Sequence, residues 1–171
     1  GGVATRAYMP ERVTKDMDIL VRRDDGEEVV ERLGAAGYKK VSRLAVPGYL
    51  MRSPDGVELD VLFGEYEWLE EALARHGYDP AGYPVIRLPY LIILKLAANR
   101  GRDVGDMTTM LGWVSSEDEL DKVRAVVARY SPEDSGDLES LIFMGCARRW
   151  RPTSPPRVWK SSRSTWASCA T

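Results

Sequence analysis

The hydrophobic and polar positions change their spacing about halfway along the chain. In the first half, short segments alternate apolar and polar residues, a pattern typical of half-buried strands. In the second half, apolar residues recur three and four positions apart, as on the buried face of a helix. Strands therefore dominate the first half and helices the second. This order predicts an α+β fold with a small mixed β-sheet followed by a C-terminal helical bundle.

The first half contains the expected strands. Their predicted ranges are 17–21, 38–44, 48–52 and 57–63, with a short extended segment at 84–87. The segment Ser53-Pro54-Asp55-Gly56 separates two of these strands and consists of turn-forming residues, so it predicts a hairpin. Two helices, over 24–34 and 67–76, are expected between the strands.

The second half predicts four helices and then a tail. The helices are expected over 88–99, 102–114, 116–130 and 132 to about 147. We therefore expect an α/β core at 1–87, a helical part of the same domain at 88–147, and a disordered basic tail at 148–171. The tail is rich in Ser, Pro and Arg and has no apolar period.

Composition narrows the class of protein. Of the 171 residues, 44% are hydrophobic and 29% are charged, which is ordinary for a globular domain. The two cysteines, Cys146 and Cys169, form neither a metal-ligand spacing nor a disulfide framework, so we expect a cytoplasmic protein. No apolar run approaches the roughly 18 residues of a membrane span, which predicts no membrane segment.

The net charge of −2 is distributed unevenly along the chain. The tail from residue 148 carries six basic residues and no acidic one. Subtracting these six from the 24 basic residues leaves 18 against 26 acidic residues, so the body has a charge of about −8. An acidic body argues against a broad surface for binding nucleic-acid phosphates.

Three aspartates are the candidates for chemistry. Asp16 and Asp18 flank the start of the first predicted strand, where side chains two residues apart point to the same face. Asp60 lies in a later strand between apolar residues, which is unusual unless its face looks onto the same site. Carboxylate oxygens brought together in this way suit Mg²⁺. Gly1 and Gly2 add a backbone that can approach a phosphate closely.

This ordered set resembles the nucleotidyltransferase superfamily of the DNA polymerase β type, and more closely the minimal bacterial toxins of the AbiEii and MenT type. The resemblance covers residues 1 to about 115. It rests on Gly1-Gly2, the segment RVTKDMDIL at 12–20, LDVL at 59–62, and KLAANRGRDVGD at 95–106. In that family an apolar strand precedes the two glycines, so we expect that an N-terminal strand is missing from this chain.

The resemblance implies a role for each matching residue. Asp16, Asp18 and Asp60 would hold Mg²⁺ (or Mn²⁺), and Asp60 would also help to deprotonate the attacking hydroxyl. Lys95 would neutralise phosphate charge and so count among the catalytic residues. The nucleotide-binding residues would be Gly1, Gly2, Thr14, Lys95 and Arg102.

The implied activity is a Mg²⁺-dependent transfer of a nucleoside monophosphate from an NTP to a hydroxyl. The acceptor would be an RNA, such as the 3′ end of a tRNA, or a protein. The resemblance further implies a toxin of a toxin–antitoxin system, with an antitoxin protein as partner. The alternative from a different class is a non-catalytic nucleotide-binding or interaction module that keeps the same fold.

Structural explanations stay open for the same residues. Asp16 and Asp18 can act as turn or cap residues before a strand, and Asp60 can be a solvated residue of an edge strand. Lys95 can extend from an apolar helix towards solvent. A helix start with a local salt bridge is one explanation for Arg102, Asp103 and Asp106. The functional alternative is that this segment positions Lys95 or the acceptor. His76, the only histidine, suits a helix C-terminus.

Overall fold

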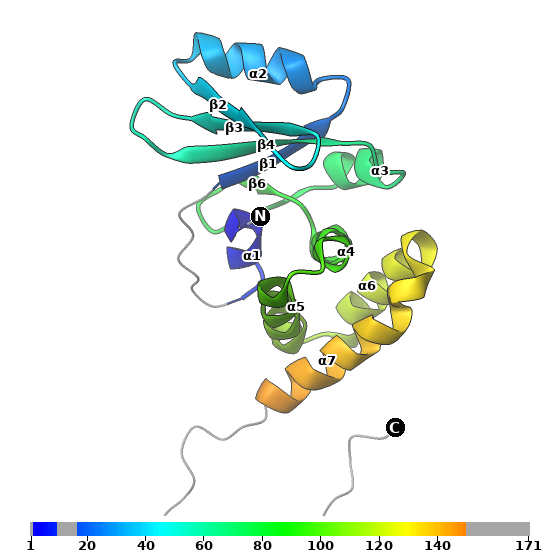
Figure 1. The fold of residues 1–171 in the computed structure, drawn as a ribbon. Coiled ribbons are helices and arrows are strands. Elements are labelled where there is room, and N and C mark those ends of the chain that lie inside the picture. Colours follow the sequence, from blue (N-terminus) through cyan, green and yellow to red (C-terminus); the bar gives the residue numbers. More distant parts are fainter. Residues whose placement is uncertain (1, 10–16, 150–171) are drawn as a thin grey trace, which may run out of the picture.

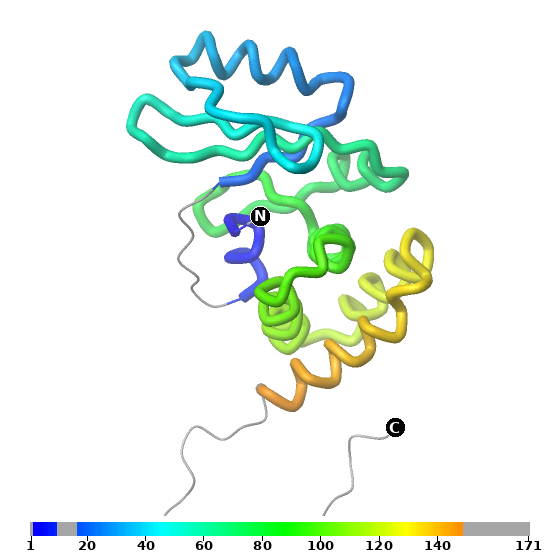
Figure 2. Tube along the Cα trace, in the orientation of Figure 1, coloured from blue at the N-terminus to red at the C-terminus, as the bar shows by residue number. Residues whose placement is uncertain are grey.

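The structure, a computed structural model, describes residues 2–9 and 17–149. A four-stranded sheet lies between one helix, α2, and a larger helical half (Figures 1 and 2). This is a mixed α+β architecture, as the sequence predicts. Among the helices in the described ranges, none is both long and apolar enough to cross a membrane.

The sheet is mixed and has the order β1-β4-β3-β2. β1 runs parallel to β4, whereas β3 is antiparallel to both β4 and β2. The strands are β1 (Met17–Arg22), β2 (Lys39–Arg43), β3 (Gly48–Arg52) and β4 (Glu58–Gly64). All four predicted strands and the predicted hairpin are therefore confirmed. After β1 the chain passes through a helix to β2 at the other edge of the sheet, and β3 and β4 then lead back until β4 lies beside β1.

Local hydrogen bonds explain why the hairpin turns where it does. The backbone N–H of Gly56 donates to the carbonyl oxygen of Ser53 at 3.0 Å. The N–H of Val57 donates to Ser53 Oγ at 2.9 Å. Gly56 has a φ of +85°, a conformation that residues with a Cβ rarely adopt. The turn thus fixes the register of β3 on β4.

One face of the sheet is covered by α2 (Gly26–Ala35). Its Val30 packs with a buried cluster from β3 and β4: Tyr49, Met51, Leu59 and Val61. Ile19 and Val21 of β1 pack at the margin of this cluster. Side chains at these alternate positions point towards α2, so the intervening residues of β1 and β4 point to the opposite face.

The opposite face meets the helical half. Its elements are α1 (Gly2–Arg6), α3 (Leu69–Ala74), β5 (Gly77–Tyr78), β6 (Pro84–Val85), α4 (Leu88–Ala98), α5 (Gly101–Trp113), α6 (Glu117–Tyr130), a 3₁₀ turn η1 (Pro132–Asp134) and α7 (Ser135–Arg149). The four helices predicted in the second half are confirmed. The predicted helix at 67–76 forms only over α3, and the short elements α1 and β5 were not predicted.

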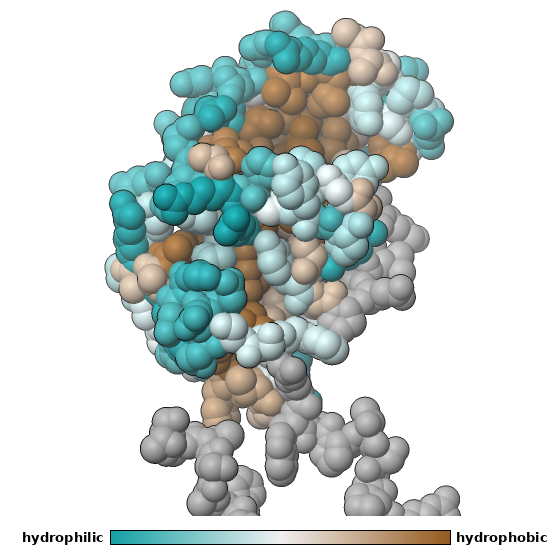
Figure 3. Space-filling model, turned by 180° about the vertical axis from the view of Figure 1, so that it is seen from behind, coloured by the Kyte–Doolittle hydropathy of each residue, from teal (hydrophilic) through white to brown (hydrophobic). Residues whose placement is uncertain are grey.

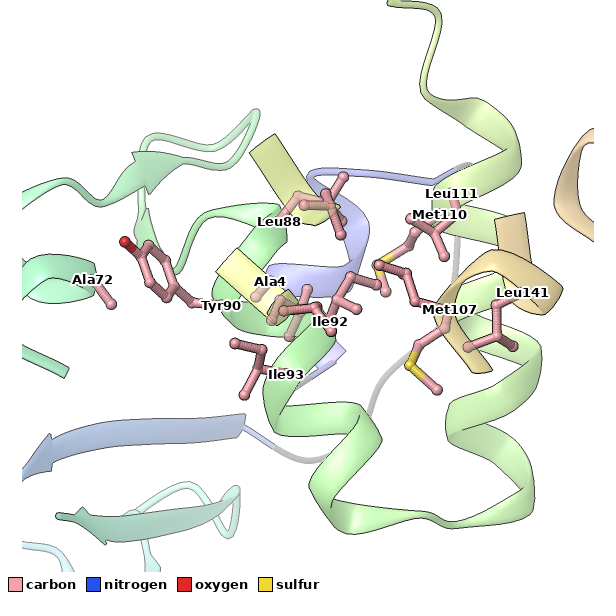
Figure 4. Packing of buried hydrophobic residues seen from close by; sticks show 14 of the residues in the cluster. Ala4, Ala72, Leu88, Tyr90, Ile92, Ile93, Met107, Met110, Leu111 and Leu141 are labelled. Carbon is pink, nitrogen blue, oxygen red and sulfur yellow. The ribbon is translucent and has the colours of Figure 1, made fainter. Parts of the chain in front are cut away.

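α4 is the central element of this half. It is apolar on almost every side because other elements surround it, and Ile92 is fully buried. Figure 4 shows Leu88 and Ile92 of α4 beside Met110 of α5, while Tyr90 points towards Ala72 of α3. α4 thus links the elements next to the sheet to the outer helices.

α5 and α7 cross at two glycines. A Cβ built on Gly145 would lie 2.4 Å from the carbonyl oxygen of Thr108 and 2.7 Å from the backbone nitrogen of Gly112. No real Cβ approaches backbone atoms so closely, so the crossing requires glycine at this position. Because the obstructing atoms are backbone, a side chain can be accommodated only if the helices move apart.

We therefore predict that Gly145→Ala lowers the free energy of unfolding by about 1–3 kcal/mol through overpacking. Urea unfolding, monitored by circular dichroism, measures this change in the free energy of unfolding. Gly105→Ala in α5 is the matched control, because a Cβ there meets nothing within 4 Å. That control should be neutral or stabilising by up to about 1 kcal/mol. Equal stability of the two variants would contradict the close crossing.

Candidate functional site

The parallel pairing of β1 with β4 places two of the candidate carboxylates side by side. Asp18 and Asp60 are Cα partners in the register of the two strands. Neighbouring strands lie roughly 4.8 Å apart, and partners in register point to the same face of the sheet. Both residues are half-buried. Two carboxylates are thus neighbours on one face, although they are 42 positions apart in the sequence.

This face looks towards the helical half and away from α2. Leu20, two residues after Asp18, packs against the core of the helical half. Ile19, on the alternate face, packs against the cluster under α2. Like charges directly opposite each other on a sheet repel. Carboxylate oxygens are the hard donors that Mg²⁺ and Mn²⁺ prefer, so the chemistry of this pair is compatible with either ion.

The remaining predicted ligands lie partly outside the described residues. Asp16, Gly1 and Thr14 fall in the ranges that the structure does not describe. Gly2 is the first residue of α1, which packs against β1 and so begins next to the strand that carries Asp18. Within residues 2–9 and 17–149, no group of three or more His, Cys, Asp or Glu side chains could hold a metal ion.

Lys95 lies in a buried ionic cluster. Its Nζ donates to Asp103 Oδ1 at 2.7 Å and to Asp106 Oδ2 at 2.8 Å. All three residues are less than 9% exposed. Arg100 joins the cluster from its edge, with its Nε 3.1 Å from Asp103 Oδ2. The cluster ties the end of α4 to the first turns of α5, and the ammonium charge of Lys95 is matched by two carboxylates.

The charges around Asp103 control its pKa. Burial by itself raises the pKa of this carboxyl group, but the hydrogen bond and the charge of Lys95 outweigh burial. Arg100 and Arg102 act in the same direction, so the pKa of Asp103 lies below its ordinary value. Arg102 itself is exposed in the first turn of α5. Its guanidinium is therefore accessible from solvent, unlike the Lys95 ammonium.

The sequence offered the segment of Asp103 and Asp106 as one that positions Lys95, but it did not specify a direct ion pair between them. The spacing of 8 and 11 residues spans the connection between two helices, so neither pair is a helical neighbour pair. Asp103 does form a local salt bridge, but with Arg100, which lies outside the expected group of Arg102, Asp103 and Asp106. The signal that could have revealed the cluster was the single charge in an otherwise apolar helix, which requires a buried partner.

The other residues with reactive side chains are exposed. His76 Nδ1 lies 3.0 Å from the carbonyl oxygen of Leu73, and its ring packs edge-on against Tyr78. Cys146 is exposed on α7. These contacts agree with a histidine at the end of a helix and suggest no nucleophile.

The described part of the helical half contains a larger and a smaller cavity. The larger, about 650 Å³, is bordered by Tyr8 after α1, Trp113 at the end of α5 and Glu119 of α6. The smaller, about 240 Å³, lies between α4, α5 and α7. Neither is lined by Asp18 or Asp60. The carboxylate pair therefore lies on the sheet face, apart from both hollows.

The sequence was also compared with known proteins. No model of a protein family matches it, and no curated protein matches it either.

We predict that Lys95→Met lowers the free energy of unfolding by roughly 3–5 kcal/mol, because it leaves two buried carboxylates without their cation. Urea unfolding at neutral pH measures the change. Lys122→Met is the control, since Lys122 pairs with Glu119 on the exposed surface of α6. Such surface pairs contribute at most about 1 kcal/mol. Similar small losses in both variants would show that the cluster does not stabilise the fold.

The lowered pKa of Asp103 predicts how stability depends on pH. Because the folded-state pKa lies below the ordinary value of about 4, the stabilisation is complete above that value. It is lost as the pH falls through the lower folded-state pKa. We therefore expect Asp103→Asn to be less stable than the wild type at pH 7, with a difference that narrows towards about pH 3. Urea unfolding at several pH values measures this difference in stability. A difference that does not change with pH would contradict a lowered pKa for Asp103.

Proposed function

We propose that this protein is a Mg²⁺-dependent nucleotidyltransferase with the fold of that superfamily. The observation that carries the proposal is the register of β1 on β4, which places Asp18 directly beside Asp60. Two aspartates in register on one face of a sheet bring carboxylate oxygens together, and carboxylate oxygens are the donors that Mg²⁺ takes. The ordered motif from Gly1-Gly2 to the segment 95–106 supports the same class.

In the proposed reaction, Asp18 and Asp60, together with Asp16, would hold Mg²⁺. Bound there, Mg²⁺ would offset the negative charge that develops on the phosphate oxygens. Asp60 accepts the proton of the acceptor hydroxyl. The hydroxyl oxygen forms a bond to the α-phosphorus, the bond from the α-phosphorus to the bridging oxygen breaks, and pyrophosphate leaves with that electron pair.

Lys95 and Arg102 have different roles in this proposal. Lys95 offers no net positive charge to a triphosphate, because Asp103 and Asp106 neutralise it. We therefore assign Lys95 mainly to positioning α5. Arg102, exposed at the start of α5, is then the side chain better suited to contact phosphate oxygens. Gly1, Gly2 and Thr14 complete the proposed nucleotide site by resemblance alone.

The proposal also concerns the molecule whose hydroxyl accepts the nucleoside monophosphate. A hydroxyl on RNA, such as a tRNA 3′ end, and a hydroxyl on a protein both satisfy the chemistry. The acidic body favours an acceptor that enters with a short segment over one that lies along a broad surface. A toxin role with a protein antitoxin as partner rests on the resemblance to the AbiEii and MenT type.

We predict that the protein transfers label from at least one of the four α-³²P-labelled NTPs to RNA or protein of a cell extract in the presence of Mg²⁺. Asp60→Asn should reduce this transfer at least 100-fold, on the order of the effect of removing one group that acts on the transition state. Separating RNA from protein before counting identifies the acceptor, and the NTP that gives label identifies the preferred base.

Glu58→Gln is the matched control for this variant. Glu58 lies two residues before Asp60 on the same face of β4, and it pairs with Arg52 at 2.9 Å on the surface. The control should keep the transfer within about twofold, because exposed pairs contribute little. Label that persists in Asp60→Asn would refute a role for Asp60. No label with the wild-type protein would favour the non-catalytic module.

A further inference from the structure

The two faces of β2 and β3 differ in their chemistry. On the face under α2, Met51 is buried, and Lys40 Nζ lies 3.7 Å from the centre of the Tyr49 ring in the same cluster. Figure 3 shows apolar side chains directly below α2. Because alternate residues of a strand point to opposite faces, Lys39 and Arg52 lie on the face away from α2. This is also the face of the carboxylate pair formed by the aspartates of β1 and β4.

The register places Lys39 and Arg52 beside that pair. Lys39 is the Cα partner of Arg52, and Arg52 is the Cα partner of Glu58 on β4. Glu58 lies two residues before Asp60, so Arg52 is a diagonal neighbour of Asp60 on the same face. Such diagonal neighbours lie about 7–8 Å apart, which a long side chain can span. This face therefore carries carboxylates on β1 and β4 and cations on β3 and β2.

Both cations have donors that no other side chain uses. The side chain of Arg52 is 50% exposed and gives one hydrogen bond, from Nη2 to Glu58 Oε1 at 2.9 Å. A guanidinium has five N–H donors in a fork that matches phosphate oxygens, so most of them remain available. Lys39 is exposed, and its ammonium forms no ion pair within the described part of the chain. The Glu58→Gln variant keeps an acceptor oxygen for Arg52, so it leaves the guanidinium in place.

We propose that Lys39 and Arg52 bind the outer phosphates of the NTP in the proposed reaction, and this assignment rests on the proposed function. A nucleoside triphosphate is still an anion when a divalent cation is bound to it, so its outer phosphates require further positive charge. The carboxylates of the site repel these phosphates, and the cations one diagonal step away offset that repulsion. Lys95 cannot supply this charge, because Asp103 and Asp106 neutralise it.

The test is the affinity of the full chain for a non-hydrolysable ATP analogue in saturating Mn²⁺, without an acceptor, by isothermal titration calorimetry. We expect the double variant Lys39→Gln/Arg52→Gln to weaken binding of the analogue at least about tenfold, because charge-assisted hydrogen bonds to phosphate are lost. Binding of Mn²⁺ alone should change less than about twofold, because neither side chain is a metal ligand.

The matched control is the double variant Lys40→Gln/Arg43→Gln. These residues lie on the same edge strand and carry the same charges, but both contact the ring of Tyr49 on the face under α2. Because exposed charges on the other face are screened by salt, the control should weaken binding of the analogue less than about twofold. Circular dichroism and urea unfolding show whether both double variants keep the wild-type fold.

The possible outcomes separate this assignment from the proposed function. Unchanged binding of the analogue in Lys39→Gln/Arg52→Gln would overturn the assignment alone. So would an equal loss in the two double variants, since net charge would then explain it, or an equal loss of Mn²⁺ binding, since the variant would then disturb the metal site. A wild-type protein that binds no analogue at all would instead refute the proposed function, and this assignment with it.

Discussion

The parallel pairing of β1 with β4 is the constraint on which the rest of the structure depends. It brings a strand from the start of the chain next to one that follows the hairpin, and its register sets Asp18 against Asp60. The same register sends the alternate residues towards α2, where they join the buried cluster. A shift by one residue would bury the carboxylates under α2 and expose the apolar side chains. Packing under α2 therefore holds the carboxylates in position on the opposite face.

The helical half supplies a second constraint. α4 is surrounded by apolar neighbours, and its one charged side chain, Lys95, is compensated by Asp103 and Asp106 of α5. The close crossing of α5 and α7 at Gly112 and Gly145 then fixes the outer helices. These contacts fix α4, α5 and α7 relative to one another.

The pattern of apolar and polar residues predicted those helices and strands that are long enough to show a period. The four strands of the main sheet and the last four helices belong to this group, and turn chemistry located the hairpin. α1 has five residues and β5 has two, which is too short for any periodicity. The parallel pairing of β1 with β4 and the partners of Lys95 depend on contacts distant in the sequence, so no local pattern could specify them. For the site, alternation predicted the faces of Asp18 and Asp60, whereas only the fold shows that the two residues are in register.

The most direct test of the central claim is metal binding at the carboxylate pair. Mn²⁺ titrated into the protein with a non-hydrolysable ATP analogue, and followed by electron paramagnetic resonance, reports the bound ion without requiring an acceptor. The account predicts saturable binding that is lost in both Asp18→Asn and Asp60→Asn and kept in Glu58→Gln. Binding that is unchanged in the two aspartate variants would show that the register of β1 on β4 does not form a metal site.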